Sequence, residues 1–193
     1  FALDVSPYVD FVSVGGAEDI APMRALLDKA DPKSEIWLEG QHASDANAAL
    51  RTVLKAAREG ANAVVFSELG REALPALGRA LDLMRGYALS PVSYDRHQVT
   101  STEADAQPFH VTFFDAATET HLVAFFSENL ARGEADASVK TLSSSIQDAK
   151  RTDVVGDSSE FMRFIITDPK ANVAEILTSF SPCPVFMSYR ALG

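Results

Sequence analysis

Between Val9 and Gly86 the chain repeats one pattern three times: a short apolar run, a polar or glycine-rich break, and a stretch with helical spacing. The apolar runs are residues 9–14, 36–39 and 63–66. Strands that alternate with helices in this way form parallel sheets, because each helix returns the chain to the same end of the sheet. The pattern therefore predicts a βαβαβα portion over residues 1–89, with its three strand-to-helix junctions along one edge of a parallel sheet.

Helical spacing and end signals predict where the three helices lie. The first is expected over residues 17–30, where apolar residues recur at intervals of three and four. Ser44 is expected to cap the second helix, with Asp45 at its positive end and Gly60 at its C-terminus. The third helix is expected to end at Gly86. Its predicted buried stripe consists of Leu74, Leu77, Leu81 and Met84.

The pattern changes after residue 89. Residues 90–108 are polar, contain prolines and show neither helical nor strand periodicity, so we expect a linker or a long surface loop. The portion 109–193 is expected to be mixed α+β, in the order ββαβαβ. Its expected elements are a hairpin of 109–114 and 121–126, a helix at 137–150, a strand at 161–167, a helix at 171–180 and a strand at 185–189. One mixed sheet and two small α/β subdomains fit this order equally well.

An excess of acidic residues limits the kinds of partner. The chain has 27 Asp and Glu against 17 Lys and Arg, which gives a formal net charge of −10. A protein that binds the phosphate backbone of nucleic acids needs a basic face, and the longest basic cluster here is Lys150-Arg151. We therefore expect no nucleic-acid binding. The acidic balance favours a solubilising surface, and docking to a basic partner is the alternative.

Cysteine use and hydropathy indicate the compartment. Cys183 is the only cysteine, so no internal disulfide can form, and a buried thiol is expected there. No apolar run approaches the ~20 residues of a membrane helix. We therefore expect a cytoplasmic protein that does not enter a membrane. Because the chain begins with Phe1 rather than Met, we also expect that something preceded it, either a removed signal peptide or an upstream region.

Local motifs give only weak signals for chemistry. Gly15-Gly16 precedes a helix, as phosphate-binding glycines do, but the nucleotide-binding fingerprints are missing and Glu18 already brings negative charge. The four histidines show no metal-ligand spacing. Residues 154–158 resemble the Gly-Asp-Ser motif of SGNH-type esterases, but no histidine follows Ser158 to serve as its base. We therefore expect no cofactor and no metal, and a turn or helix cap at Ser158.

One edge of the predicted parallel sheet gathers polar residues. In open parallel sheets, ligands bind beyond the carboxyl ends of the strands, where the connections diverge. Glu39 and Glu68 are candidates for a pair of carboxylates there, and His42 is able to titrate near neutral pH. The expected ligand-binding residues are Gly15, Gly16, Glu39, Gln41, His42, Ser67 and Glu68.

The sequence favours a binding protein over an enzyme. It contains no recognisable nucleophile–base set, metal spacing or cofactor fingerprint. We therefore expect a non-catalytic α/β domain that binds a partner protein or a small ligand, in a regulatory or assembly role. The alternative is a small hydrolase or proton-transfer enzyme that uses Glu39, His42 and Glu68. A third hypothesis, an acidic inhibitor that docks on a basic partner, fits the net charge. The oligomeric state stays open.

Overall fold

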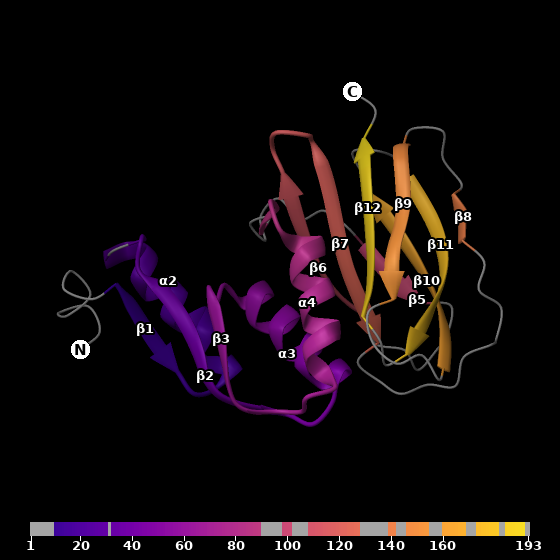
Figure 1. Ribbon diagram of the computed structural model, residues 1–193. Coiled ribbons are helices and arrows are strands. Elements are labelled where there is room, and N and C mark those ends of the chain that lie inside the picture. Colours follow the sequence, from indigo (N-terminus) through magenta and orange to yellow (C-terminus); the bar gives the residue numbers. More distant parts are fainter. Residues whose placement is uncertain are drawn as a thin grey trace. The chain divides into compact units, whose positions relative to one another are not determined.

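The computed structural model describes residues 10–30, 32–89, 98–101, 108–127, 139–141, 146–154, 160–168, 173–181 and 184–191. The chain divides into two compact units, Phe1–Leu74 and Pro75–Gly193. The first unit is built on a parallel sheet and the second on antiparallel sheets (Figure 1). The protein is therefore mixed α/β, as the sequence predicts.

The first unit contains a three-stranded parallel sheet in the order β1-β2-β3 (Figure 1). β1 spans Phe11–Val14, β2 spans Glu35–Ala43 and β3 spans Ala63–Leu69. The predicted parallel sheet is thereby confirmed. β2 and β3 are longer than predicted. Residues 40–42 and 67–68 belong to these strands, whereas the sequence pattern assigns them to the breaks after the strands.

Two of the predicted helices lie in this unit. A short 3-10 helix, η2, covers Ala17–Asp19 and leads into α2, Ile20–Ala30, so the first predicted helix is confirmed with a tighter first turn. The second is α3, Ala46–Glu59. As the sequence predicts, the helix begins after the short polar residues Ser44 and Asp45 and ends at Gly60.

The caps of α3 differ from the sequence prediction at one end. Its N-cap is Asp45, whose carboxylate accepts a hydrogen bond from the Ala48 N–H at 2.9 Å. Ser44 was expected in this role, but its hydroxyl donates to the Asp45 carboxylate instead, at 3.1 Å. At the C-terminus Gly60 has a φ of 99°, and its N–H donates to carbonyls of the last turn, as predicted.

Both helices pack on the same face of the parallel sheet. The buried core of this unit joins strand residues to residues of α2 and α3: Val14, Ile20, Leu27, Ile36, Leu38 and Ala56. This arrangement follows from the strand order, because two right-handed crossovers that step in the same direction place their helices on the same side. The other face of the sheet carries no helix from the described part of this unit.

Arg24 and Asn62 join α2 to the start of β2. The Asn62 side-chain oxygen accepts hydrogen bonds from the Ile36 N–H at 2.9 Å and from the Arg24 guanidinium at 2.8 Å. Arg24 also donates to the Ser34 carbonyl at 3.2 Å. These bonds satisfy backbone groups at the end of the sheet where β2 and β3 begin, so this end has a structural role.

The third predicted helix is present as α4, Ala73–Met84, and from Pro75 onward it belongs to the second unit. The predicted stripe is correct for Leu77, which is buried, but wrong for Leu74 and Leu81, which are 57% and 55% exposed. The buried face is formed by Ala73, Ala76, Leu77 and Ala80. The prediction was based on the spacing of the large leucines. The face that the helix actually buries consists mostly of alanines, which are too small to stand out in a hydrophobic pattern.

The second unit contains two antiparallel sheets (Figure 1). The larger has the order β4-β6-β7-β12-β9 and the smaller the order β5-β10-β11-β8. The strands are β4 Ala88–Leu89, β5 Gln98–Ser101, β6 Pro108–Asp115, β7 Thr120–Ser127, β8 Val139–Thr141, β9 Ile146–Val154, β10 Glu160–Asp168, β11 Val173–Ser181 and β12 Val185–Ala191. β5 contacts β6, and β11 contacts β7 and β9, so the two sheets lie against each other.

The predicted hairpin is confirmed as β6 and β7. In its turn the Asp115 carboxylate accepts hydrogen bonds from the Thr118 hydroxyl at 2.5 Å and from the Ala117 N–H at 2.9 Å. These two bonds lower the pKa of Asp115. Residues 122–126 of β7 are buried without interruption, which shows that both faces of this strand are covered.

Two predicted helices of the second half are wrong. β8 and β9 occupy most of the range 137–150, and β11 occupies the range 171–180. β11 pairs with β10 along its whole length, from Val173 to Ser181. Apolar residues in so short a segment fit a period of two as well as a period of 3.6, so the neighbouring strand decides the conformation. The order ββαβαβ is therefore replaced by antiparallel strands.

The range 90–108, predicted as a linker or long loop, contains a strand. Gln98–Ser101 form β5 and pair antiparallel with β10. Pro108 begins β6. Residues 90–97 and 102–107 lie outside the described residues. The two compact units divide between Leu74 and Pro75, whereas the predicted portions divide after residue 89.

Candidate functional site

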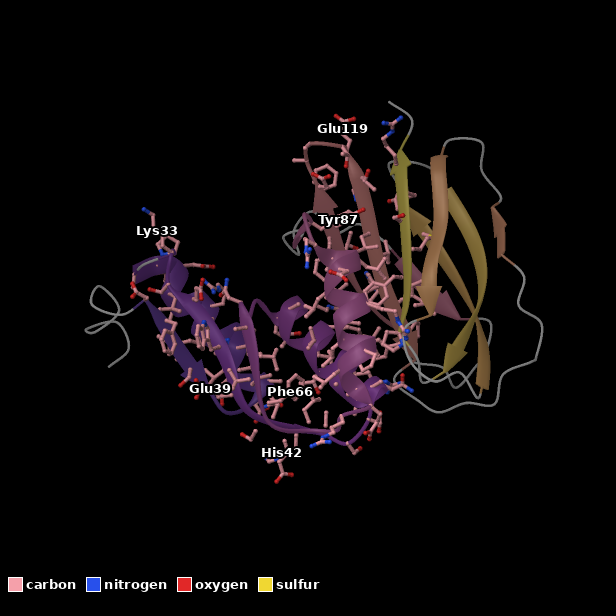
Figure 2. The ribbon with its side chains drawn as sticks, viewed as in Figure 1. Lys33, Glu39, His42, Phe66, Tyr87 and Glu119 are labelled. Carbon is pink, nitrogen blue, oxygen red and sulfur yellow. The ribbon has the colours of Figure 1, made fainter. Side chains whose placement is uncertain are left out.

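The parallel pairing of β1, β2 and β3 brings the carboxyl ends of the strands to one edge of the sheet. Figure 2 shows Glu39 and His42 toward the end of β2, away from Lys33 at its start. A ligand crevice forms at such an edge where the strand order reverses and the connections pass to opposite faces. The order β1-β2-β3 contains no reversal, and both helices lie on one face. The physical basis for expecting a crevice at this edge is therefore missing.

Gly40 interrupts the regular pairing of β2 with β3. Its φ of 72° lies in the left-handed region, and the register shifts between Leu38 and Gln41 and again between Gln41 and His42. A bulge of this kind exchanges the two sides of a strand. Leu38 is buried before the bulge, whereas after it Ala43 is buried and His42 is exposed. The bulge therefore turns His42 away from the core.

Gln41 ties the end of β2 to the chain that follows β1. Its side-chain amide donates to the Gly15 carbonyl at 3.2 Å and to the Glu39 carbonyl at 2.9 Å. The fold thus brings together Gly15 and Gln41, two of the predicted ligand-binding residues. Because the amide and the carbonyls bond to each other, their observed role is to hold the strand ends.

His42 and Glu68 form the most direct pair at this edge. The two residues are opposite each other in the register of β2 and β3, and His42 Nδ1 lies 3.4 Å from Glu68 Oε2. Their side chains are 63% and 83% exposed. Ion pairs in water contribute only about 0–1 kcal/mol. Residues used for general acid–base catalysis are ordinarily tuned by burial and by enclosed neighbours. Both of these side chains stand in solvent.

The other predicted site residues are spread along the same edge. Gly16 is the N-cap of η2, and the Glu18 carboxylate lies directly against it. This nearby negative charge disfavours phosphate binding at the start of η2. Glu39 is partly buried on β2 and Ser67 is exposed on β3. Ser158 and Cys183 lie outside the described residues.

The face of the parallel sheet opposite the helices carries an aromatic pair. Strand alternation and register assign to this face, hereafter the open face, the residues Phe11, Ser13, Glu35, Trp37, Glu39, Ala63 and Val65. None of them is buried and none is basic. Phe11 is 43% exposed, and its ring stacks on Trp37 with centroids 4.3 Å apart and planes inclined by 17°.

Trp37 is held at two points on the open face. Its indole N–H donates to Glu35 Oε2 at 2.8 Å, and its ring stacks on Phe11 from the neighbouring strand. The polar atom of the indole is thereby satisfied while the ring stays partly accessible. The pair was not predicted from the sequence, because each strand was interpreted there as a uniformly apolar run. The sequence feature that could have revealed the pair is the alternation along each strand. It places Phe11 and Trp37 on one face of the sheet and the buried Val14 and Ile36 on the other.

Comparisons with known proteins do not assign a function. No protein-family model, no curated protein and no solved structure matches the chain. Within the described residues, no three or more His, Cys, Asp or Glu side chains are grouped so as to hold a metal ion. In the same part of the chain, no helix combines the length and apolar character needed to cross a membrane.

Proposed function

We propose that the protein is a non-catalytic α/β binding domain that docks a partner protein on the open face of β1, β2 and β3, in a regulatory or assembly role. The observation that carries this proposal is the stacked Phe11–Trp37 pair on a face that no helix of the described part of its unit covers. Parallel sheets are ordinarily covered on both faces. A partner would supply the second covering layer.

The charges on the open face favour a basic partner. Glu35 and Glu39 flank Trp37 at two-residue spacing on β2, and none of the residues assigned above to the open face is Lys or Arg. The whole chain carries a formal net charge of −10. A protein segment that combines Lys or Arg with apolar side chains would pair with the carboxylates and cover the aromatic rings. We therefore commit to a basic, apolar protein segment as the occupant.

The aromatic residues would supply most of the affinity. Large, rigid aromatic side chains are the commonest energetic centres of protein interfaces, because they bury much apolar area at small cost in conformational entropy. The stack with Phe11 and the bond to Glu35 already restrict the indole before binding. Trp37 is thus prepared to act as an anchor.

The alternative function, hydrolysis or proton transfer by Glu39, His42 and Glu68, has weaker support. His42 and Glu68 are exposed on the strands after the bulge, whereas Glu39 lies before it, partly buried. A small-ligand site at the strand ends is likewise less favoured, because the strand order lacks the reversal that forms a crevice there.

A peptide array tests the docking proposal. The array would present synthetic peptides in which basic, acidic and apolar residues vary independently, and it would be probed with the intact protein and with Trp37→Ala. The matched control is Leu26→Ala, an exposed apolar residue on α2, away from the open face. We expect the protein and the control to bind basic, apolar peptides and Trp37→Ala to lose this binding. Equal binding by Trp37→Ala, or no preference for basic peptides, contradicts the proposal.

A further inference from the structure

The side chains around Trp37 form a more specific arrangement than a general apolar surface. On β2, Trp37 lies between Glu35 and Glu39 on the same side of the strand, about 7 Å from each along the chain direction. One face of the indole is covered by the Phe11 ring from β1. The register partner of Trp37 on β3 is Ala63, whose side chain is a single methyl group. Ala63 can cover little of the indole from the β3 side, because its side chain is so small.

We infer that this arrangement is a binding site for an arginine side chain of the partner. The guanidinium would stack on the indole face above Ala63 and pair with the carboxylates of Glu35 and Glu39. The inference rests on the proposed function, because it names the group of the basic partner that the open face recognises. Phe11 supports the site from the far side of the indole and does not touch the guanidinium.

Arginine fits this site better than lysine for a geometric reason. A guanidinium is flat, so it stacks on an aromatic ring while its N–H groups point outward in the plane toward neighbouring acceptors. Here the acceptors stand on both sides of the ring along β2, at Glu35 and Glu39. A lysine ammonium is compact and strongly hydrated, and it cannot meet the ring and both carboxylates in one plane.

Glu35 has two functions in this arrangement. One carboxylate oxygen accepts the hydrogen bond of the indole N–H at 2.8 Å and so fixes the orientation of the ring. The other oxygen is available to accept from the guanidinium. Glutamine at this position keeps an acceptor for the indole but loses the negative charge. The variant Glu35→Gln therefore separates ring positioning from charge recognition.

Trp37 is the only tryptophan of the chain, so its emission reports on this site alone. The full protein is titrated with a short amidated peptide of alternating leucine and arginine, and with counterparts in which lysine or the neutral analogue citrulline replaces arginine. Binding is followed by Trp37 emission and by the anisotropy of a dye on the peptide. We expect the arginine peptide to bind about fivefold or more tightly than the lysine peptide, and citrulline to bind most weakly.

Variants complete the test. We expect Glu35→Gln to weaken the arginine peptide about fivefold or more and to reduce its preference over the lysine peptide. The control Glu59→Gln removes the same charge at the end of α3 and should leave binding unchanged. Equal affinity for arginine and lysine peptides, both lost in Trp37→Ala, overturns the arginine site and leaves the docking proposal standing. Binding that persists in Trp37→Ala, or no response to any of the peptides, overturns the arginine site, and the array then decides the docking proposal separately.

Discussion

At the scale of single residues, the strand ends of the parallel sheet depend on the absence of a side chain at Gly70. Its N–H donates to the Ala43 carbonyl at 3.0 Å, and a Cβ at this position would overlap the backbone carbonyl oxygen of Ser44. Because a backbone atom cannot rotate away, Gly70→Ala should lower the free energy of unfolding by about 1–3 kcal/mol. Urea denaturation followed by Trp37 emission measures this.

A second glycine provides the matched control for Gly70→Ala. Gly78 lies inside α4, where nothing stands within 4 Å of the position that a Cβ would take. Alanine is the better helix former, so Gly78→Ala should be neutral or stabilise the protein by up to about 1 kcal/mol. If the two substitutions have the same effect, the close approach at Ser44 does not constrain the strand ends.

We expect Asp45 to make the stability of the protein depend on pH. The Ala48 N–H lowers the pKa of its carboxyl group, with the Ser44 hydroxyl adding to the effect. A lowered pKa means that the stabilisation is present at neutral pH and is lost as the pH falls below about 4, the ordinary aspartate range. Asp45→Ala should lower the free energy of unfolding by about 1 kcal/mol near pH 7, and by progressively less as the carboxyl group protonates.

The pH dependence is measured as a difference between variants. Unfolding of the protein, of Asp45→Ala and of Asp45→Asn is compared at several pH values between neutral and acid. Asparagine also caps helices, so this variant should keep most of the stability at pH 7 without its acid dependence. A gap between Asp45→Ala and the unaltered protein that stays constant into the acid range would show that the carboxylate charge does not contribute.

Single residues also show where sequence reasoning reaches its limit. The sequence placed the end of α3 at Gly60, because a glycine after an apolar helical stretch has few other roles. It chose Ser44 over Asp45 as the N-cap, since both residue types cap well and only the backbone geometry decides. It did not predict the bulge at Gly40, because a glycine in a turn and a glycine in a bulge look alike in a sequence.

At the scale of elements, α4 allows the observed buried face to be tested against the predicted stripe. Leu77 is buried, whereas Leu74 and Leu81 are exposed. Leu77→Ala should therefore lower the free energy of unfolding by about 2–5 kcal/mol, and each of the other two leucine-to-alanine changes by no more than about 0.5 kcal/mol. Thermal or urea unfolding followed by circular dichroism measures all three. Equal losses at the three leucines would support the predicted stripe instead.

The elements that the sequence predicts correctly are those with local support. β1 to β3, α2, α3 and the hairpin of β6 and β7 each combine a clear period with a strong end signal. The predictions for the residues of β9 and β11 were wrong, because these residues fit the period of a helix and that of a strand equally well. Their conformation depends on pairing with β12 and β10, respectively. The strand β5 was missed for the same reason, since only its pairing with β10 defines it.

At the scale of the whole molecule, strand order decides which surface is available to a partner. The sequence predicted a parallel sheet correctly, and from it a site at the strand ends. A ligand crevice at the strand ends requires that the connecting helices pass to opposite faces of the sheet. The order of strands and helices along the chain does not determine to which face each helix passes. Because the observed order is β1-β2-β3, α2 and α3 cover one face, and no helix from the described part of this unit covers the other. We therefore propose the open face around Trp37 as the docking surface, and the predicted site at the strand ends stays a prediction.

The division into two compact units predicts that the molecule unfolds in two steps. The first unit, Phe1–Leu74, has its own core, formed by the parallel sheet with α2 and α3, and it contains Trp37, the only tryptophan. Circular dichroism reports on both units, whereas Trp37 emission reports on the first alone. A smaller unit buries a smaller fraction of its surface, so we expect the emission transition at a lower urea concentration than the main circular dichroism transition.

Two leucine-to-alanine variants make this test specific to each unit. Leu54 is buried on α3 in the first unit, and Leu122 is buried on β7 in the second. Each change should destabilise its own unit by about 2–5 kcal/mol. We expect Leu54→Ala to shift the Trp37 emission transition and Leu122→Ala to shift the main circular dichroism transition, each with little effect on the other. If both variants move both transitions together, the two units unfold as one cooperative body, and the open face is then stabilised by the whole chain rather than by its own unit.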